Sequence, residues 1–598
     1  MEQLNKTISK IHNYIYANEG LSNSETLNEF LKIFYCKILD ENNGNQLRLA
    51  CTNTEILSII ECLYQNLLIK LEGIIDKNEK ITLRDETLLY IINELNEISL
   101  TNISADIKGH ILQRIIDRSY RESRGQFFTP APVVDFIVKM INPQYGEYGC
   151  DPACGTGGFL FSALNYISQN KPIDNIQLNK IHFYDISKSL IKLVAMRMMF
   201  EFSDYNVHYE VKDSIRDEFN FKYDYILTNP PFGTQGKISD KKILSKYILG
   251  TDISGKTIKS QVPDILFVEK VIKILKDGGR AAIILPDGNF ENPSLEYFRK
   301  FLVNNVKINA IISLPDGTFI PYGTGVKSSI LFISKEKTTE NYDVFYGKIT
   351  KLGYSFSKHS KTELLANGTI NEDYSQIINA FYNKKYSDFA YLVNISEIQK
   401  NNYIMSESFY SPIYKRTIDS IKQGNYALLK ELVEFNYKKI KIDKESQYNY
   451  VEISDVNAYS SEIINSNIMY GEELPSRASY LLQKDNIIVA TSGNSIGTIK
   501  QAKAFVTERY EGSICTNGFT VMKATNISKY YLLYFFNSKE FLNQMLKYKY
   551  GTAIPCIGRN DFENILVPIP NNEELTIIVD RIKKAIHLRE EAFQLMNM

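Results

Sequence analysis

Between residues 145 and 335, short apolar runs alternate with amphipathic stretches, and this alternation constrains the fold more than any other feature of the chain. The runs have the length of strands, and they are IHFYDI (181–186), YDYILTN (223–229), GRAAIILP (279–286), INAIISLP (308–315) and SSILFIS (328–334). Strands that alternate with helices predict a parallel sheet covered by helices on both faces. Two of the runs end in LPDG (285–288 and 314–317), which we interpret as a common strand ending rather than a duplication.

The patterns on either side of this region differ from it and from each other. In the N-terminal part, apolar residues recur every three or four positions, as in LNEFLKIFYCKIL (27–39) and EILSIIECLYQNLLIKLEGII (55–75), which predicts helices. Residues 336 to about 425 are polar and weakly periodic, and indicate a meandering extension with helices near its end. Short β-like runs then resume, namely YNYVEISDV (448–456), DNIIVATSGN (485–494) and FTVMKA (519–524), before an amphipathic helix at 572–596.

A chain of 598 residues is too long for one hydrophobic core, so we predict a multidomain fold. Its predicted parts are an N-terminal helical bundle, an α/β Rossmann-like core and a C-terminal mixed α/β domain with a long terminal helix. The predicted boundaries are 1–120 for the bundle, 121–412 for the core, 413–425 for a linker and 426–598 for the C-terminal domain.

Composition narrows the class of protein. No apolar run reaches the roughly 18 residues that span a bilayer, and MEQLNKTISK has no hydrophobic signal region, so we expect a cytoplasmic protein with no membrane partner. The formal net charge is zero, so affinity for nucleic acid must come from local basic surfaces such as NYKKIKIDK (436–444). The seven cysteines include no CxxC pair, so we expect buried free thiols and no metal site.

The stretch LTNPPFG (227–233) ends an apolar strand abruptly. Pro230 and Pro231 lack the N–H that a sheet ladder needs, so the chain must leave the sheet at Asn229. An Asn-Pro pair is often no more than a rigid turn. The side-chain oxygen of Asn229 and the carbonyl of Pro230 are also two neutral acceptors that could hold both hydrogens of an exocyclic base amine. Phe232 could then stack on a base that has left the duplex.

The segment DPACGTGGFL (151–160) places three glycines between a predicted strand and a predicted helix. Glycines let the backbone turn tightly and approach a ligand, and the following helix N-terminus favours an anionic group. The segment matches neither GxGxxG nor the P-loop pattern, so ATP is not favoured. Asp185, after the next strand, is placed to accept hydrogen bonds from ribose hydroxyls, and Asp213 is a candidate to meet an adenine amino group. Each aspartate alone is more often a cap or turn residue.

In this order, DPACGTGG, YDIS, KDSI and TNPPF resemble the motifs of the gamma class of DNA N6-adenine methyltransferases, most closely the modification subunits of type I restriction-modification systems. The resemblance extends to RGQFFTPAPVVDFIV (124–138) and QVPDILFVEKVIKILKDGGRAAIILPDG (261–288), and covers residues 5 to 412 approximately. It implies that residues 121–412 transfer a methyl group from S-adenosylmethionine to the N6 atom of a flipped-out adenine in double-stranded DNA.

The same resemblance implies roles for individual residues. Asp151, Gly155 and Gly157 would line the methionine part of S-adenosylmethionine, and Asp185 would bind the ribose. Asp213 would lie near the adenine end of the cofactor or the target pocket. The residues assigned to the cofactor are Phe128, Thr129, Pro130, Asp151, Ala153, Gly155, Thr156, Gly157, Asp185, Ile186, Asp213, Ser214 and Asn229, and those assigned to catalysis on the target base are Asn229, Pro230, Pro231 and Phe232.

The C-terminal part resembles one target-recognition half of a type I specificity subunit. The resemblance rests on YVEISDVNAYSSE (450–462), LLQKDNIIVATSGNSIGTIKQA (481–502) and YKYGTAIPCIGRNDFENILVPIPNNEELTIIVDRIKKA (548–585). It implies that this part reads the DNA sequence and that the final helix packs against partner helices. Type I specificity subunits carry two such halves in a separate chain. A single half therefore suggests a homodimer through the C-terminal helices, since half-site readers commonly act as symmetric dimers.

Nuclease activity is not predicted, because PDILFVEK (263–270) lacks the spacing of a PD-(D/E)xK site and the sequence has no helicase P-loop. Cleavage would need a separate restriction or defence subunit. Two other functions stay open at this point. Similar turns occur in enzymes that methylate RNA bases or glutamine amides, which allows an RNA- or protein-directed methyltransferase. A chain with an inactive core could instead be a DNA-binding component of a defence complex.

Overall fold

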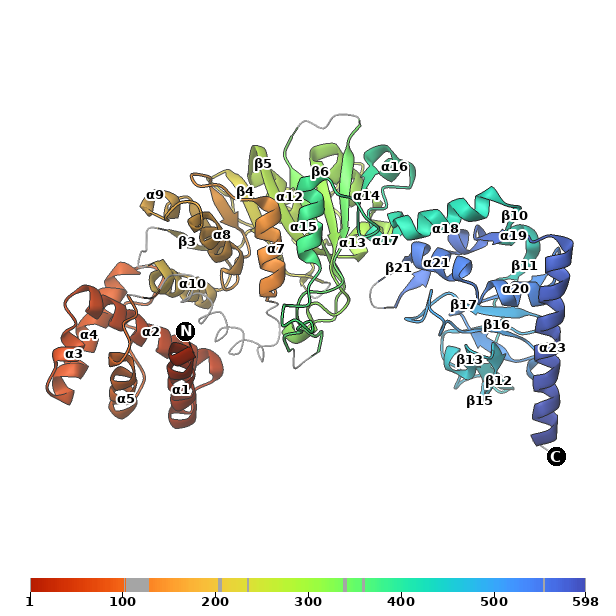
Figure 1. The fold of residues 1–598 in the computed structure, drawn as a ribbon, viewed down its shortest axis with the longest axis horizontal. Helices are drawn as coiled ribbons and strands as arrows, with labels where there is room; N and C mark the ends of the chain where they lie inside the picture. Colours follow the sequence, from red (N-terminus) through yellow and green to blue (C-terminus); the bar gives the residue numbers. More distant parts are fainter. Residues whose placement is uncertain are drawn as a thin grey trace. The chain divides into compact units, whose positions relative to one another are not determined.

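The computed structural model describes residues 2–101, 103, 128–202, 207–233, 236–336, 341–357, 361–551 and 554–596 (Figure 1). Residues 124–127, which begin one of the segments named above, lie outside this set. The chain forms two compact units. The first contains residues 1–286, 297–386 and 394–396, and the second contains residues 287–296, 387–393 and 397–598.

Helices fill the N-terminal part of the first unit (red in Figure 1). They are α1 (Glu2–Glu19), α2 (Asn23–Asn42), α3 (Gln46–Leu49), α4 (Asn53–Lys70) and α5 (Asp85–Asn96). Capping boxes begin α2, at Ser22 and Glu25, and α4, at Thr52 and Glu55. The predicted helices at 27–39 and 55–75 are confirmed, although α4 ends at Lys70. These helices share an apolar core with α10 (Lys188–Phe202), in which the rings of Phe34 and Phe200 lie 5.6 Å apart.

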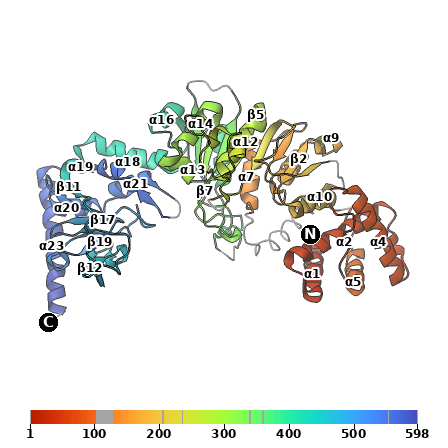
Figure 2. The same cartoon turned by 180° about the vertical axis from the view of Figure 1, so that it is seen from behind.

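A mixed sheet forms the rest of the first unit (orange to green in Figure 1 and seen from behind in Figure 2). The strands of this sheet that lie in the first unit are β1 (Gly149–Asp151), β2 (Ile181–Asp185), β3 (His208–Val211), β4 (Tyr223–Thr228), β5 (Leu275–Pro286), β6 (Lys307–Ser313), β7 (Ser328–Ser334) and β8 (Asp343–Lys348), in the order β3-β2-β1-β4-β5-β7-β6-β8. The helices of this region are α7 (Ala131–Ile141), α8 (Gly158–Ser168), α9 (Asn175–Leu178), α10, α11 (Lys241–Leu244), α12 (Pro263–Ile274), α14 (Glu296–Asn305) and α15 (Tyr374–Asn383), with 3-10 helices η2 (Ile248–Gly250) and η4 (Ile320–Tyr322).

The five strands predicted between 145 and 335 are confirmed, but the prediction of a parallel sheet is wrong for one of them. Strands β1 to β5 pair with one another in parallel, whereas β7 is antiparallel to both β5 and β6. The link from β6 to β7 contains only η4 and no crossover α-helix, so the chain returns in the opposite direction. Every residue of β1 and β7 is buried, as expected for a sheet covered on both faces.

The region 336–425 is more ordered than its weak periodicity indicates. Strand β8 extends the sheet by pairing in parallel with β6, and its residues Val344 to Gly347 are buried. Helix α15 follows and lies beside α7 (Figure 1). The apolar stretch of β8 is only three residues long, which is too short to show a period. Its strand state therefore depends on the partner strand.

The second unit contains two larger sheets and a long final helix (blue in Figure 1). From residue 390 onward the elements are β9 (Ala390–Asn394), α16 (Ile395–Lys400), α17 (Glu407–Tyr410), α18 (Pro412–Gln423), β10 (Tyr426–Leu428), α19 (Leu429–Leu432), β11 (Val433–Asn436), β12 (Gln447–Val451), β13 (Val456–Asn457), β14 (Glu462–Ile463), β15 (Asn467–Tyr470), β16 (Ala478–Leu481), β17 (Ile487–Ala490), β18 (Lys503–Phe505), β19 (Ile514–Thr516), β20 (Phe519–Ala524), α20 (Lys529–Phe535), α21 (Lys539–Tyr548), β21 (Lys549–Tyr550), β22 (Cys556–Ile557), α22 (Arg559–Glu563), β23 (Leu566–Pro568) and α23 (Asn572–Met596). One sheet has the order β11-β20-β17-β18-β14-β13 and the other β15-β12-β19-β16. The predicted strands near 448, 485 and 519 and the terminal helix are confirmed.

Within the described residues, the helices are too short or too polar to cross a lipid bilayer.

Candidate active site

A tight loop follows β1, at the carboxyl edge of the sheet. Gly155 and Gly157 have φ values of +53° and +80°, in the left-handed region that favours glycine. The N–H of Cys154 donates to the carbonyl of Tyr184 at 2.9 Å, which ties the loop to β2. A Cβ atom on Gly157 would lie 2.7 Å from the ring of Phe161, so this position has no room for a side chain.

Two carboxylates hold this loop in place. Asp151 is 1% exposed, and its Oδ1 accepts a hydrogen bond from the N–H of Ala153 at 3.0 Å. Asp185 accepts from the N–H of Gly155 at 3.0 Å and from the N–H of Ser187 at 2.9 Å. The pKa of Asp151 is raised to about 7, mainly by burial and in smaller part by the nearby charge of Asp185. Burial also raises the pKa of Asp185. A cation beside these groups would favour their ionised forms.

The proline turn lies at the end of β4, as predicted. The strand ends at Thr228, and Pro230 is buried, Pro231 exposed and Phe232 half-buried. The side chain of Asn229 donates from Nδ2 to Oγ1 of Thr129 at 3.0 Å. Its Oδ1 is buried and has no hydrogen-bond partner among the described residues. Buried acceptors are rarely left unsatisfied, so this oxygen is a position at which a ligand donor would be stabilising.

A small cavity of about 50 Å³ joins these groups. It is lined by Phe128, Thr129, Val134, Asp151, Ala153, Cys154, Gly155, Thr156, Gly158, Phe159 and Asn229. Seven of these residues were assigned to the cofactor from the sequence, and Val134, Cys154, Gly158 and Phe159 were not. The missed residues lie in the same two segments as the predicted ones. Helical spacing from Pro130 to Val134, and the continuity of the glycine loop into α8, were signals that could have identified them.

The other predicted residues do not line this cavity. They are Pro130, Gly157, Asp185, Ile186, Asp213, Ser214, Pro230, Pro231 and Phe232. Ser214 supports the loop, because its Oγ donates to the carbonyl of Pro152 at 2.6 Å. Asp213 accepts from the N–H of Ile215 at 3.1 Å and pairs with Arg216 at 3.0 Å, so its carboxylate caps a turn in this structure. Ile186 is 71% exposed.

Three features meet at one edge of an α/β sheet: the glycine loop after β1, the carboxylate that ends β2 and the polar turn that ends β4. This arrangement defines the class of enzymes that bind a nucleotide-type cofactor at the carboxyl ends of their strands. The chain belongs to the N-6 DNA Methylase family, whose sequence profile matches residues 103–416. Residues 425–591 match the Type I restriction modification DNA specificity domain. The fusion of the two modules in one chain, predicted from the sequence motifs, is confirmed.

Known proteins similar to this chain support the same assignment. This chain is 30% identical over 269 residues to the Type I restriction enzyme EcoEI methylase subunit of Escherichia coli. The matched residues are 43% of this chain and 53% of that protein. The chain spans about half the length of the curated relatives at this level of identity.

Two solved structures share the fold. The type I restriction-modification methyltransferase subunit from Streptococcus thermophilus is 18% identical, with 68% of this chain and 98% of that chain covered and a TM-score of 0.51. The type IIG restriction endonuclease BpuSI is 12% identical, with 98% and 75% covered and a TM-score of 0.52. At these identities the likeness concerns the fold alone.

Proposed function

We propose that this chain is a sequence-specific DNA adenine-N6 methyltransferase that uses S-adenosylmethionine and carries its own recognition domain. The unsatisfied oxygen of Asn229 is the observation that carries the proposal, because it is a buried acceptor at the edge of the cavity. Membership of the N-6 DNA Methylase family supports the same activity. We further propose that the chain is the modification and specificity component of a restriction-modification or phage-defence system.

The residues around the cavity fit the methionine end of the cofactor. Asp151 offers a buried carboxylate to a cationic ligand, and the open space beside Gly155 leaves the backbone accessible. S-adenosylmethionine supplies a methyl group on a positively charged sulfonium. The residues proposed to hold it are Phe128, Thr129, Pro130, Asp151, Ala153, Gly155, Thr156 and Gly157, with Asp185 and Ile186 toward the ribose, Asp213 and Ser214 toward the adenine, and Asn229 at the methyl end.

Target binding depends on how the Asn229 amide is oriented. Because Nδ2 donates to Thr129, Oδ1 stays free to accept a hydrogen of the adenine amine. The carbonyl of Pro230 would accept the second hydrogen, Pro231 would stiffen the turn and Phe232 would stack on the flipped base. Two acceptors hold the amine nitrogen in position for attack, so no titratable base is required before the transfer.

The electrostatics of Asp151 predict how cofactor binding depends on pH. Folding raises the pKa of Asp151 from 3.8 to about 7, so the folded protein without cofactor is most stable when this carboxyl is protonated. This contribution to the stability of the fold is lost as the pH rises from about 4 to 7. The cationic cofactor prefers the ionised form. Its affinity should therefore increase between about pH 5.5 and 7.5, by at most about tenfold per unit, when measured by calorimetry.

The replacement Asp151→Asn should remove most of this pH dependence and weaken binding at the upper end of the range. Asp277→Asn is the matched control. Asp277 lies near the start of β5, away from the carboxyl edge of the sheet, and its side chain is almost fully exposed. An unchanged pH profile in Asp151→Asn would show that another group senses the cofactor.

The division of the chain, its partners and its location are also proposals. We propose functional boundaries at 1–120, 121–412, 413–425 and 426–598, action in the cytoplasm on double-stranded DNA, and a separate restriction or defence subunit for any cleavage. We also propose a homodimer through α23. Near the start of this helix, Leu575, Ile578 and Val579 pack on the core of the second unit, whereas Leu588 is 53% exposed.

If α23 mediates dimerisation, Leu588→Ser should weaken self-association, because it removes an exposed apolar side chain from the contact face. The adjacent change His587→Ser should have little effect, since this side chain is also exposed but polar. Sedimentation equilibrium over a range of protein concentrations measures the difference. Equal dissociation constants for the two variants would exclude Leu588 from the interface.

Incubation with labelled S-adenosylmethionine and plasmid DNA, RNA or cell protein tests the proposed activity. We expect label in DNA, and digestion to nucleosides should yield N6-methyladenosine in its deoxy form. Label in RNA or protein but not in DNA would contradict the proposal. DNA binding without any transfer would favour the inactive component of a defence complex instead.

A further inference from the structure

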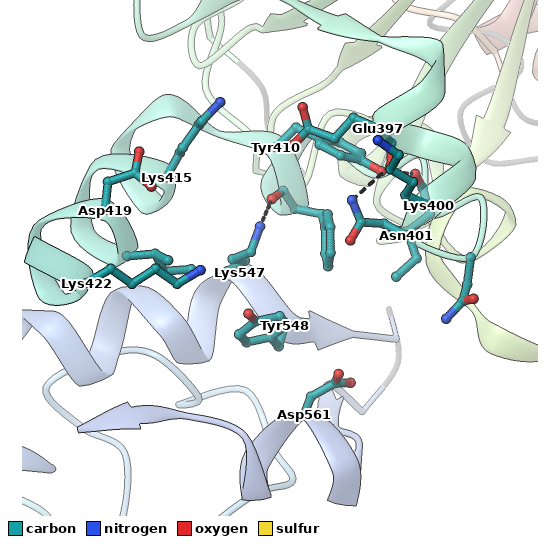
Figure 3. Close-up of a pocket in the computed structure, with 14 residues that line it drawn as sticks. Glu397, Lys400, Asn401, Tyr410, Lys415, Asp419, Lys422, Lys547, Tyr548 and Asp561 are labelled. Atoms are coloured by element: carbon teal, nitrogen blue, oxygen red, sulfur yellow. Dashed lines mark hydrogen bonds between the residues drawn. The ribbon is translucent and has the colours of Figure 1, made fainter. Parts of the chain in front are cut away.

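A second cavity, of about 390 Å³, lies entirely within the second unit (Figure 3). Helices α16 to α18 form one side of it, and α21 with the start of α22 forms the other. Asn543 on α21 donates from Nδ2 to Oγ1 of Thr417 on α18 at 2.9 Å, so the two sides are joined by a direct contact. The cavity is lined by Glu397, Lys400, Asn401, Asn402, Ile404, Phe409, Tyr410, Lys415, Ile418, Asp419, Lys422, Lys547, Tyr548 and Asp561.

Four lysines line this cavity, namely Lys400, Lys415, Lys422 and Lys547. In the part of the chain that the structure describes, no carboxylate oxygen lies within 4.0 Å of any of their ammonium groups. The neighbouring Arg416 differs, because it forms two bonds to Asp388, of 2.6 and 2.7 Å, and does not line the cavity. These four lysines therefore bring cations that lack an ion pair to one cavity.

Lys547 is the most enclosed of the four. Its ammonium group donates to the carbonyl of Phe409 and lies 3.9 Å from the centre of the Phe409 ring. The pKa of Lys547 is lowered to about 8, mainly by burial and also by the charges of Lys415 and Lys422, against the opposing effect of Glu397. A carbonyl and a ring neutralise an enclosed cation only in part. An anion in the cavity would be stabilised by Lys547 and by the cations beside it.

The acidic residues of the cavity do not cancel this charge. The cavity has four lysines but only three acidic residues, Glu397, Asp419 and Asp561. Burial also raises the pKa of Asp561, which favours its neutral form. Figure 3 shows Tyr548 and Asp561 on the side of the cavity opposite α18. The volume is within the range of small-ligand sites, which is about 300 to 1,000 Å³, so it can accept a group larger than a simple ion.

We propose that this cavity binds a phosphate group. Two sources share this chemistry: the backbone phosphodiester of bound DNA, and the phosphate of a free nucleotide. The DNA source rests on the proposed function, whereas the nucleotide source is independent of it. Lysine ammonium groups are point charges that bind phosphate without a fixed bidentate geometry, which suits a cluster drawn from three separate helices.

The variant Lys422→Gln tests the site with little risk to the fold, because this side chain is exposed and has no ion pair among the described residues. Lys430→Gln is the matched control: Lys430 is also exposed, on the nearby α19, but does not line the cavity. DNA binding is measured by fluorescence anisotropy at several salt concentrations without cofactor. In the DNA case, Lys422→Gln weakens binding to all sequences and reduces the slope of log K against log salt by about 1, and Lys430→Gln does not.

The second arm measures thermal stability with inorganic phosphate or adenosine monophosphate, against sodium chloride of equal ionic strength. In the free-nucleotide case, both ligands raise the melting temperature of the wild-type chain and of Lys430→Gln, but not that of Lys422→Gln. The two variants then have equal slopes of log K against log salt for DNA binding. The proposal is overturned if Lys422→Gln matches Lys430→Gln in both arms. A chain that binds no DNA at all would refute the proposed function, and the second arm would still decide the site.

Discussion

Replacing Asn229 by alanine should lower the rate of methyl transfer to DNA by about two orders of magnitude or more, while the affinity for S-adenosylmethionine changes little. The reason is the position of Oδ1, which is buried, unsatisfied and at the edge of the cavity proposed for the cofactor. Removing it takes away one of the two acceptors that we propose for the adenine amine. Single-turnover transfer of labelled methyl groups and calorimetry with the cofactor measure the two quantities separately.

Thr129→Val provides the graded comparison for this prediction. It keeps the Asn229 side chain but removes the 3.0 Å hydrogen bond that orients the amide. A neutral hydrogen bond contributes about 1 kcal/mol, so the rate should fall by roughly fivefold. If Asn229→Ala instead loses cofactor binding as strongly as transfer, the main role of Asn229 is to hold the cofactor and not the target base.

Gly157→Ala should lower the free energy of unfolding by about 2 to 5 kcal/mol. The left-handed φ of +80° costs a residue with a side chain about 1 to 2 kcal/mol, and overpacking adds about 1 to 3 kcal/mol. The added Cβ would lie 2.7 Å from the ring of Phe161 and 3.1 Å from that of Phe183. Urea denaturation measures the loss.

Gly158→Ala is the control for this change, because a Cβ at Gly158 meets nothing within 4 Å and the residue begins α8. Its stability should be unchanged or slightly increased, since alanine favours a helix more than glycine does. If the two replacements destabilise the protein equally, neither the left-handed backbone at Gly157 nor the contact of its added Cβ with Phe161 controls the loss of stability.

Local features of the fold were predictable from the residues that carry them. Strand β4 ends at Thr228 because the two prolines that follow Asn229 cannot join a ladder. The helices α2, α4 and α23 follow from apolar spacing. The direction of β7 was not predictable in this way, because a strand has the same side-chain period in parallel and antiparallel pairs. Strand β8 was missed for the related reason that its partner, and not its own short apolar stretch, makes it a strand.

Some candidate site residues were likewise predictable from local motifs, and for others the tertiary structure was decisive. The order of the motifs was sufficient to indicate the family and to select seven of the residues around the cavity. Asp213 was also selected, yet its carboxylate caps its own turn and pairs with Arg216. Such a competing local bond depends on the exact course of the backbone.

By itself, the sequence determined where the chain turns, which segments are helical and which family its motifs belong to, because these properties depend on residues close together in the chain. Only the tertiary structure decided that Thr129 orients Asn229 from 100 residues away and that Oδ1 is buried without a partner in a residue that lines the cavity. It also gathered four lysines between positions 400 and 547 around a second cavity. Both arrangements depend on packing between distant segments, and no local pattern in the sequence encodes the distances that packing sets.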